Sequence, residues 1–279
     1  MSDLSAAPVT PFDRPALRVR PLAMAMLALS GVAALAAFLW PLFLVPGAAV
    51  SQASQAPLVF AAILPALIAV VLTQLGSGGI DAKVLALLGV LTAIIAILRP
   101  LGAGTAGLET VFFLLILAGR VYGPAFGFLL GNTALFASAL LTAGVGPWLP
   151  YQMMASGFVG LFAGMLPRLR GWGEVAMLAL YGGVMAFTYG WLMDFAFWPF
   201  NLDASTELSY HAADTVGEKV HKFVLFNLAT SMGWNAGRAL TNIVLIAVVG
   251  RPLLAVLRRA SRKAGFGASS AAPAGRRGQ

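Results

Sequence analysis

The stretch that decides the fold runs from Gly119 to Pro167 and reads GRVYGPAFGFLLGNTALFASALLTAGVGPWLPYQMMASGFVGLFAGMLP. It is long enough to cross a bilayer twice, because one spanning helix needs about 20 apolar residues. Small residues recur in it four apart, in two series: Gly123, Gly127, Gly131 and Ser156, Gly160, Gly164. Such residues weaken a helix in water, but in lipid they let two helix backbones approach closely. The stretch therefore predicts tightly packed membrane helices.

Composition extends this conclusion to the whole chain. Of the 279 residues, 59% are hydrophobic and 10% are charged, whereas an ordinary soluble domain has about 25% charged residues. Mean hydropathy is +0.87. The net charge of +8 does not indicate nucleic-acid binding, because the basic residues cluster at the edges of apolar runs. The fold class predicted is an all-α, polytopic membrane helix bundle.

Apolar runs of spanning length organise the chain into one membrane unit. Eight candidate spans follow from the length that a bilayer requires: 22–45, 57–76, 82–98, 108–121, 123–143, 149–167, 173–197 and 222–249. The fourth is short enough to be re-entrant. Around the spans we expect a cytoplasmic N-terminal tail over residues 1–21 and a basic cytoplasmic tail over 251–279. Residues 22–81 would hold the first two spans, and residues 82–250 the remaining six.

The distribution of lysine and arginine predicts the orientation. With the N-terminus in the cytoplasm, only Arg99, Lys219 and Lys222 lie outside, as the positive-inside rule requires. An even number of spans then returns the C-terminus to the cytoplasm of a cell-membrane protein. Two segments face outward, Pro100–Leu108 and Trp198–His221. They are either solvated connections or lids over a pocket that opens to the outside, since loops on rigid scaffolds often carry function.

Arg238 is the most informative single residue, because an ionisable group in the middle of a membrane span must face a cavity, a partner or the protein interior. Polar residues recur around it at helical spacing: Asn227, Ser231, Trp234 or Asn235, Arg238 and Asn242. This polar seam predicts one polar face along the last span. Two roles remain open for it, a ligand-facing surface or a set of contacts that locks helices together.

Other polar and aromatic residues of the spans complete the candidate substrate-binding set. Besides seam residues Asn227, Ser231, Trp234, Asn235 and Arg238, it contains Glu109, Asn132, Trp148, Gln152, Trp191 and Asp194. Asn132 and Gln152 could equally make hydrogen bonds between helices. The tryptophans near the outer interface could be belt anchors, or they could stack on a flat ligand.

A stripe of small residues on span 82–98 predicts a protein contact. Its members are spaced four, three, four and three apart: Ala82, Ala86, Gly89, Ala93 and Ala96. A smooth helix face of this kind admits a second helix, which belongs either to this chain or to another protein.

The sequence lacks the residues that several kinds of chemistry require. The chain has no cysteine, which excludes disulfides, thiol catalysis and cysteine-ligated metals. It has no GxxxxGK[ST] loop for ATP, and His211 and His221 are not at the spacing of a metal site. We therefore expect no catalytic residues, metal or cofactor. A membrane enzyme in which Arg238 holds a lipid phosphate and a purely structural protein remain the alternatives to binding.

The segments FLLILAGRVYGPAFGFLLG, GVGPWLPYQM and GLFAGMLP resemble the substrate-binding S component of energy-coupling factor (ECF) vitamin transporters. The resemblance covers residues 82 to about 259. It implies a six-helix core that starts at span 82–98, whose alanine-rich face contacts the T component of the transporter. The two earlier spans depart from that pattern as an N-terminal extension. The extension, the basic tail and GWNAGRA are most similar to actinobacterial members.

The resemblance also implies a division of labour. An S component binds a vitamin or related micronutrient from outside, and a T component with two cytoplasmic ATPase subunits supplies the energy. The ligand would lie in the outer half of the bundle under Pro100–Leu108 and Trp198–His221. Cobalamin or a related corrinoid is the first expectation. Ser2 stands where the metal-transporting branch has histidine, so nickel and cobalt ions are not expected.

Overall fold

The computed structural model describes residues 21–43, 82–102, 105–200 and 206–263, and within these ranges the chain is helical with short connections and no strand. The second predicted span, 57–76, and most of both predicted tails lie outside the described residues. The helix bounds, in chain order, are α1 Pro21–Phe38, α2 Trp40–Phe43, α4 Ala82–Gly102, α5 Val111–Tyr122, α6 Pro124–Leu141, α7 Leu149–Met165, α8 Gly171–Phe197, the 3-10 turn η2 Trp198–Phe200, α9 Val216–Thr230 and α10 Met232–Lys263.

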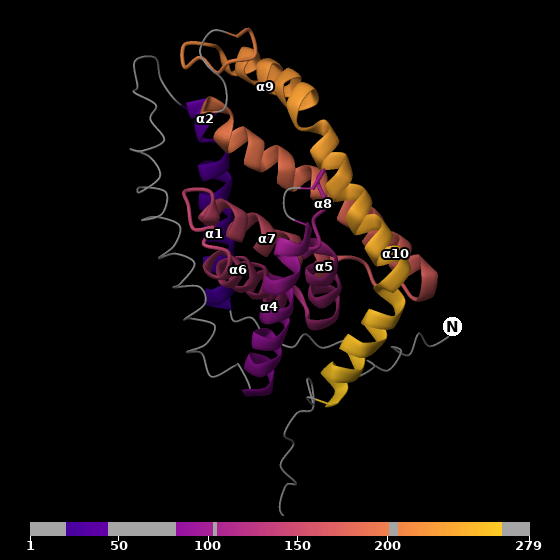
Figure 1. The fold of residues 1–279 in the computed structure, drawn as a ribbon. Helices are drawn as coiled ribbons and strands as arrows, with labels where there is room; N and C mark the ends of the chain where they lie inside the picture. The colour runs from indigo at the N-terminus through magenta and orange to yellow at the C-terminus, as the bar shows by residue number, and fades with distance from the viewer. Residues whose placement is uncertain (1–20, 44–81, 103–104, 201–205, 264–279) are drawn as a thin grey trace, which may run out of the picture.

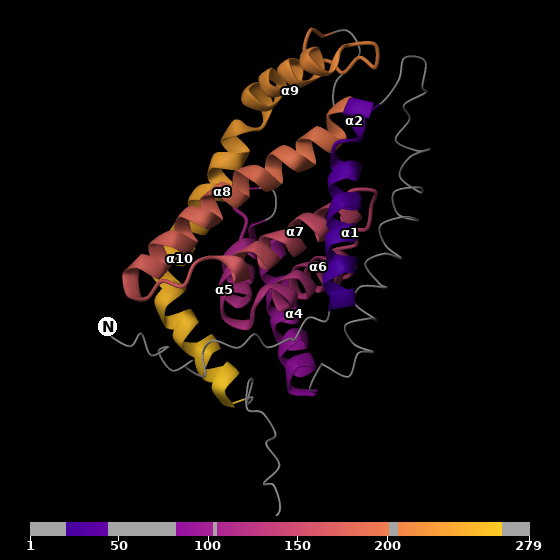
Figure 2. The same ribbon diagram turned by 180° about the vertical axis from the view of Figure 1, so that it is seen from behind.

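The described helices confirm the all-α membrane class. Four of them, α4, α6, α8 and α10, are long and apolar enough to cross a membrane, and α5 is a shorter apolar helix. Two views of the chain from opposite sides show α8 and α10 as long, slanting helices beside the group of α4, α5, α6 and α7 (Figures 1 and 2). The short α9 follows the C-terminal end of α8 and leads back into α10.

Helix α5 occupies the centre of this bundle. It has 12 residues, so it is about 18 Å long, which is well short of the roughly 30 Å hydrocarbon core. Every residue from Val111 to Gly119 is buried, and α5 contacts α4, α6, α7, α8 and α10. It ends at Gly123, whose φ of 96° suits glycine. Pro124 then opens α6 as its first residue. The short fourth predicted span is therefore an internal helix.

The glycine series of α6 and α7 does pack backbone against backbone. A Cβ atom on Gly131 would lie 2.4 Å from the carbonyl oxygen of Ser156, and one on Gly164 would lie 2.5 Å from the nitrogen of Pro124. Gly119 of α5 meets the same surface, because a Cβ there would lie 2.3 Å from the oxygen of Gly160. The prediction of close helix approach is confirmed, since no side chain larger than hydrogen fits these contacts.

The last predicted span, 222–249, differs from the structure at both ends. The helical segment starts earlier, at Val216, changes direction at Ser231 and continues to Lys263. Its first part, α9, carries charged residues and a side-chain cap at Thr215, so hydropathy alone did not reveal it. Its last turns carry Arg258 and Arg262, so the helix extends into the segment that composition assigned to a tail.

Candidate functional site

A close backbone contact between the loop after α4 and helix α10 positions the site. Ala106 and Gly107 have positive φ values of 45° and 79°. A Cβ atom on Gly107 would lie 2.2 Å from the carbonyl oxygen of Trp234, and one on Gly237 would lie 2.1 Å from the oxygen of Ala106. Only glycine permits this approach without displacement. Because the loop is held there, Glu109 reaches the middle of the polar seam.

Arg238 is paired in this position. Its Nε donates to Glu109 Oε2 at 2.5 Å, and its Nη1 donates to Asn235 Oδ1 at 2.9 Å. The guanidinium also lies over the ring of Tyr189, 5.2 Å from the ring centroid, a distance at which cation–π attraction acts. Asn242 closes the group, since its Nδ2 donates to the carbonyl oxygens of Arg238 at 2.8 Å and Glu109 at 3.3 Å.

The seam forms one buried face, as its spacing predicted. Asn227, Asn235 and Asn242 are 0–1% exposed, and Arg238 is 8% exposed. Asp194 of α8 accepts a hydrogen bond from Asn227 Nδ2 at 2.7 Å. Of the two alternatives at 234 and 235, the seam uses Asn235, whereas Trp234 is 45% exposed on the outer side of α10.

Helix α8 approaches the seam through a glycine. A Cβ atom on Gly190 would lie 1.9 Å from Asn235 Oδ1 and 2.7 Å from Arg238 Nη1. Glycine at this position therefore makes room for the two polar side chains between α8 and α10. The neighbouring residue of α8, Tyr189, is 5% exposed and packs edge-on against Phe112 of α5.

A second arginine joins the same region from α4. Arg99 Nη2 donates to Gln152 Oε1 at 2.9 Å, which links the end of α4 to the start of α7. The Tyr189 hydroxyl lies within electrostatic range of Glu109, Arg238 and Arg99. We name the convergence of these side chains from α4, its following loop, α7, α8 and α10 the Tyr189 site: Arg99, Glu109, Gln152, Tyr189, Asn235 and Arg238. Together these side chains carry hydrogen-bond donors, acceptors and an aromatic ring.

Besides Trp234, three predicted site residues lie away from the Tyr189 site and the polar seam. Asn132 Nδ2 donates to Phe128 O at 2.8 Å, and a Cβ atom on Gly157 would lie 2.3 Å from that nitrogen, so Asn132 sits in the α6–α7 contact. Trp148 is 43% exposed before α7. Trp191 packs edge-on against Phe223, 5.9 Å between ring centroids, in an aromatic cluster beyond the Tyr189 site.

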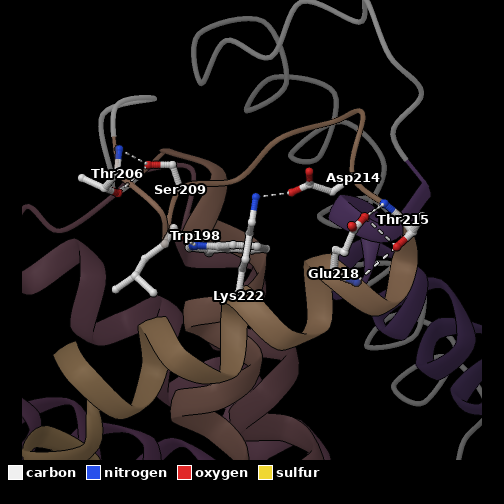
Figure 3. A network of polar contacts seen from close by, with 8 residues as sticks. Trp198, Thr206, Ser209, Asp214, Thr215, Glu218 and Lys222 are labelled. Atoms are coloured by element: carbon white, nitrogen blue, oxygen red, sulfur yellow. Dashed lines mark hydrogen bonds and ion pairs between the residues drawn. The ribbon is translucent and has the colours of Figure 1, made fainter.

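That cluster consists of Phe195, Trp198, Phe223 and Phe226, and we name it the outer aromatic cluster because it adjoins the segment predicted to face outward. Trp198 is fully buried and its Nε1 donates to Leu208 O at 2.9 Å. Figure 3 shows the described part of the predicted outer segment over it: Lys222 extends to Asp214, at 2.7 Å, and Thr206 contacts Ser209. This part of the segment is therefore folded against the bundle end rather than a simple solvated connection.

The start of α9 has a reciprocal cap. Glu218 N donates to Thr215 Oγ1, and Thr215 N donates to Glu218 Oε2 at 2.8 Å. These hydrogen bonds from the backbone and side chain of Thr215 hold the pKa of Glu218 below its usual value. Burial raises the pKa of Tyr210, and Asp214 adds to the effect.

The small-residue stripe of α4 is mostly uncovered. Ala82, Ala86, Gly89 and Ala93 are exposed, and nothing lies within 4 Å of a Cβ atom built on Gly89. Ala96, at the C-terminal end of the stripe, is instead fully buried. Within the described part of this chain, four of the five predicted contact residues are thus free of intramolecular packing.

Sequence reasoning missed Arg99, Tyr189 and Gly190 as members of the site. Arg99 did carry a signal, because it is one of the few basic residues on the side that the positive-inside rule leaves poor in charge. Tyr189 and Gly190 lie in an apolar run with no polar periodicity. Among the described residues, no three His, Cys, Asp or Glu side chains gather where they could hold a metal ion.

Comparison with known proteins supplies the family. Residues 83–250, more than half of the chain, match the family described as ECF transporter, substrate-specific component. No curated protein and no solved structure matches the chain. Members of this family are multi-pass membrane subunits that bind substrate for a transporter and are not enzymes. The chain belongs to the substrate-specific S components of ECF transporters.

Proposed function

We propose that this subunit binds a vitamin or related micronutrient from outside at the Tyr189 site. The observation that carries this proposal is a group of polar side chains from α4, its following loop, α7 and α10 in the region of Tyr189, where the guanidinium of Arg238 lies over the ring. Such a site, built from helices and a loop at a helix end, is where bundles hold small molecules. Asp194, Asn227 and Ser231 extend the polar surface outward from it.

The substrate proposal starts from cobalamin or a related corrinoid. It rests on the similarity of GWNAGRA and the N-terminal extension to actinobacterial members rather than on the geometry of the site. The first measurement is mass spectrometry of small molecules that the gently purified protein retains. A retained corrinoid supports the proposal, whereas another micronutrient replaces the corrinoid and keeps the binding role. A retained phospholipid alone would favour the membrane-enzyme alternative.

The pairing of Arg238 with Glu109 favours the helix-locking role for Arg238 itself. Its guanidinium already has a carboxylate, an amide and a ring as partners. With this helix-locking role, Arg238 and Glu109 would hold the loop and α10 together, and the ligand would contact the groups around them. A seam that only packs helices is the structural alternative, and it predicts that the purified protein retains no small molecule.

The partners would be a T component and two cytoplasmic ATPase subunits, with α4 as the contact for the T component. The uncovered face of Ala82, Ala86, Gly89 and Ala93 supports this assignment. The test is co-purification of the tagged protein with the other subunits. Ala86→Leu with Gly89→Leu should abolish it without lowering stability, because both positions are exposed. Ile94→Leu, exposed on the same helix and turned away from the stripe, is the matched control.

The orientation proposed places both termini in the cytoplasm. The chain has no cysteine, so single cysteines at Ser2, Glu207 and Gln279 would report their side without background labelling. In intact cells a membrane-impermeant maleimide should label only the cysteine at 207. Labelling at 2 or 279 would reverse the proposed topology.

A further inference from the structure

We infer that the ligand carries an anionic oxygen group, a carboxylate or a phosphate, and that Arg99 binds it. This inference rests on the proposed function of the Tyr189 site and names the chemistry that the site selects. It starts from the charge balance around Tyr189, where the guanidinium groups of Arg99 and Arg238 have different partners.

Only one of the two guanidinium groups is neutralised. Arg238 pairs with Glu109 at 2.5 Å, so the Glu109 carboxylate already balances the charge of Arg238. Arg99 donates to the neutral side-chain oxygen of Gln152 at 2.9 Å, and no carboxylate of the described residues forms an ion pair with it. Asp194 interacts electrostatically with Arg238 but lies farther along α8, where Asn227 Nδ2 donates a hydrogen bond to it. Among the described residues, one positive charge therefore remains on the Arg99 side.

The position of Arg99 makes this unbalanced charge costly in the absence of ligand. The side chain is half-buried at the outer end of α4, next to Gln152 of α7. A charge withdrawn from water needs a partner charge or several hydrogen bonds to compensate. A guanidinium has five N–H donors in a planar fork that matches carboxylate and phosphate oxygens. An anionic group of the ligand would supply the missing partner.

A structural role for Arg99 is the competing explanation. A basic residue in the last turn of a helix interacts favourably with the helix dipole, and the contact with Gln152 could tie α4 to α7. Both structural roles require Arg99 for stability of the ligand-free protein. If Arg99 instead binds an anion, the ligand-free protein does not need Arg99 for stability. The charge of Arg99 is then better compensated in the complex than in the free protein.

The experiment therefore measures stability and binding in the same variants. The full chain is purified in nanodiscs and stripped of small molecules. Melting temperatures are then measured for the wild type, Arg99→Gln, Arg99→Lys and Gln152→Ala. Arg99→Gln should melt at or above the wild-type temperature, and Arg99→Lys should behave like the wild type. A fall of several degrees in Arg99→Gln, shared by Gln152→Ala, would show a helix tie and overturn the inference.

The binding arm uses matched probes that differ in charge. They are nicotinic acid and nicotinamide, pantothenic acid and panthenol, biotin and its methyl ester, and cobalamin and cobinamide for the phosphate group, with inorganic phosphate alone. Thermal shifts give the affinities. At least one anionic probe should bind the wild type, its neutral match more weakly, and Arg99→Gln should lose about 10- to 100-fold of the anion's affinity. Absence of binding by every anionic probe, or equal binding by Arg99→Gln, would overturn the inference.

These outcomes are separate from those that test the transporter role. Loss of co-purification with a T component would remove the proposed function but leave an Arg99-dependent anion site in place. Conversely, a transporter complex that retains an uncharged micronutrient would keep the proposed function and remove the anion inference.

A second inference concerns the N-terminal helices, and it stands on different contacts. Residues 38–42, which we name the N-terminal clasp, touch the outer end of the bundle in several places. Trp40 Nε1 donates to Ala196 O at 2.9 Å, and Tyr210 Oη donates to Pro41 O at 2.8 Å. Phe38 packs edge-on against Tyr151 at 5.1 Å between ring centroids. Leu39 and Leu42 pack on the outer aromatic cluster.

We propose that the N-terminal clasp holds segment 206–215 against the bundle end. The extension would then form part of the outer closure rather than serving only for membrane insertion. The segment has its own amide hydrogen bonds, from Ser209 N to Thr206 O at 3.0 Å and from Asp214 N to His211 O at 3.2 Å. Their exchange with deuterium in the full chain reports how tightly the segment is held.

Tyr210→Phe removes only the hydroxyl that reaches the clasp. It should speed exchange in 206–215 by about two- to tenfold, the range that one net hydrogen bond supplies. Leu42→Ala should act in the same direction through lost packing. Tyr181→Phe removes an equivalent hydroxyl bond, to Val159 O at 2.6 Å, far from this segment, and should leave its exchange unchanged. Unaltered exchange in both clasp variants would overturn the proposal.

Discussion

A Cβ atom on Gly127 would lie 2.2 Å from the carbonyl oxygen of Gly160, and a Cβ atom on Gly160 would lie 2.2 Å from the carbonyl oxygen of Gly127. The contact is reciprocal, so a side chain on either residue would collide with the backbone of the other. It joins α6 to α7 at the point where α5 also approaches, through Gly119.

Gly160→Ala should therefore destabilise the bundle strongly. The added methyl group meets backbone atoms that cannot rotate away, so the helices must separate, at a cost of typically about 1–3 kcal/mol or more for overpacking. Thermal melting in detergent measures this loss of stability. Gly173→Ala is the matched control, because nothing lies within 4 Å of its Cβ position in α8. Equal melting of the two variants would mean that α6 and α7 do not pack as described.

The Arg238–Glu109 pair should behave as a coupled unit. Arg238→Ala leaves the Glu109 carboxylate without its partner in a largely buried place, and breaking such a pair typically costs about 3–5 kcal/mol. Glu109→Ala should have a similar effect. The double variant should be less destabilised than the sum of the single variants, because no isolated charge remains. Melting of the four proteins gives the coupling, and additive effects would contradict the pairing.

Ligand affinity of Arg238→Ala separates the two roles of the seam. Where Arg238 only locks the loop to α10, the variant loses stability in the free protein but keeps affinity once folded at low temperature. A loss of affinity at that temperature assigns Arg238 a direct contact with the ligand. Retained compounds, quantified by mass spectrometry at 4 °C, make the comparison without knowledge of the substrate.

A second charge cluster, at the opposite end of α8, should contribute unequally through its two arginines. Glu174 is paired with Arg120 at 2.7 Å and with Arg258 at 2.7 Å. The Arg120 side chain is 7% exposed and that of Arg258 is 38% exposed. Water screens the more exposed pair, and Arg120 also donates to Leu166 O at 2.8 Å.

Arg120→Gln should consequently lower the melting temperature more than Arg258→Gln does. Glu174→Gln should be at least as harmful as Arg120→Gln, because it leaves both arginines without their carboxylate. Glu207→Gln, at an exposed position outside the bundle, serves as a reference for losing a glutamate charge. Equal melting of Arg120→Gln and Arg258→Gln would show that burial does not govern this cluster.

The N-terminal cap of α9 should be lost in acid. Hydrogen bonds from Thr215 lower the pKa of Glu218 in the folded protein. A lowered pKa stabilises the fold above the unfolded-state value, and this contribution disappears as the pH falls through the folded-state value. Amide exchange at the first turn of α9 should therefore accelerate on acidification beyond the intrinsic pH dependence. Glu218→Gln should lack this extra acceleration, and an identical pH profile in both proteins would contradict the assignment.

The polar seam shows how far spacing alone reaches. Residues Asn235, Arg238 and Asn242 recur at helical intervals on α10, so their common face was predictable from the period of the helix. The partner of Arg238 was not predictable, because Glu109 lies 129 residues away in sequence. Glu109 reaches Arg238 because the preceding loop has positive φ values at Ala106 and Gly107, and no hydropathy pattern predicts these values.

Asn132 and Trp234 show that residue type alone does not identify the members of a site. Both are polar or amphipathic residues within apolar runs, and that property made them candidates. Asn132 instead fills the α6–α7 contact against Gly157, and Trp234 points away from the seam. Whether a polar group in a span meets a ligand or a neighbouring helix depends on the rotation of that helix, which its neighbours impose.

The amino-acid sequence by itself determined that this protein is a membrane bundle, that α6 and α7 pack through glycine, and that it is similar to the ECF S components. These properties depend on hydropathy and on spacing within one helix, both of which are local. Only the tertiary structure decided that α5 is an internal helix, that Glu109 pairs with Arg238, and that Arg99 and Tyr189 join them. Such contacts connect residues far apart in the chain, and loop geometry and helix rotation, rather than residue periodicity, bring them together.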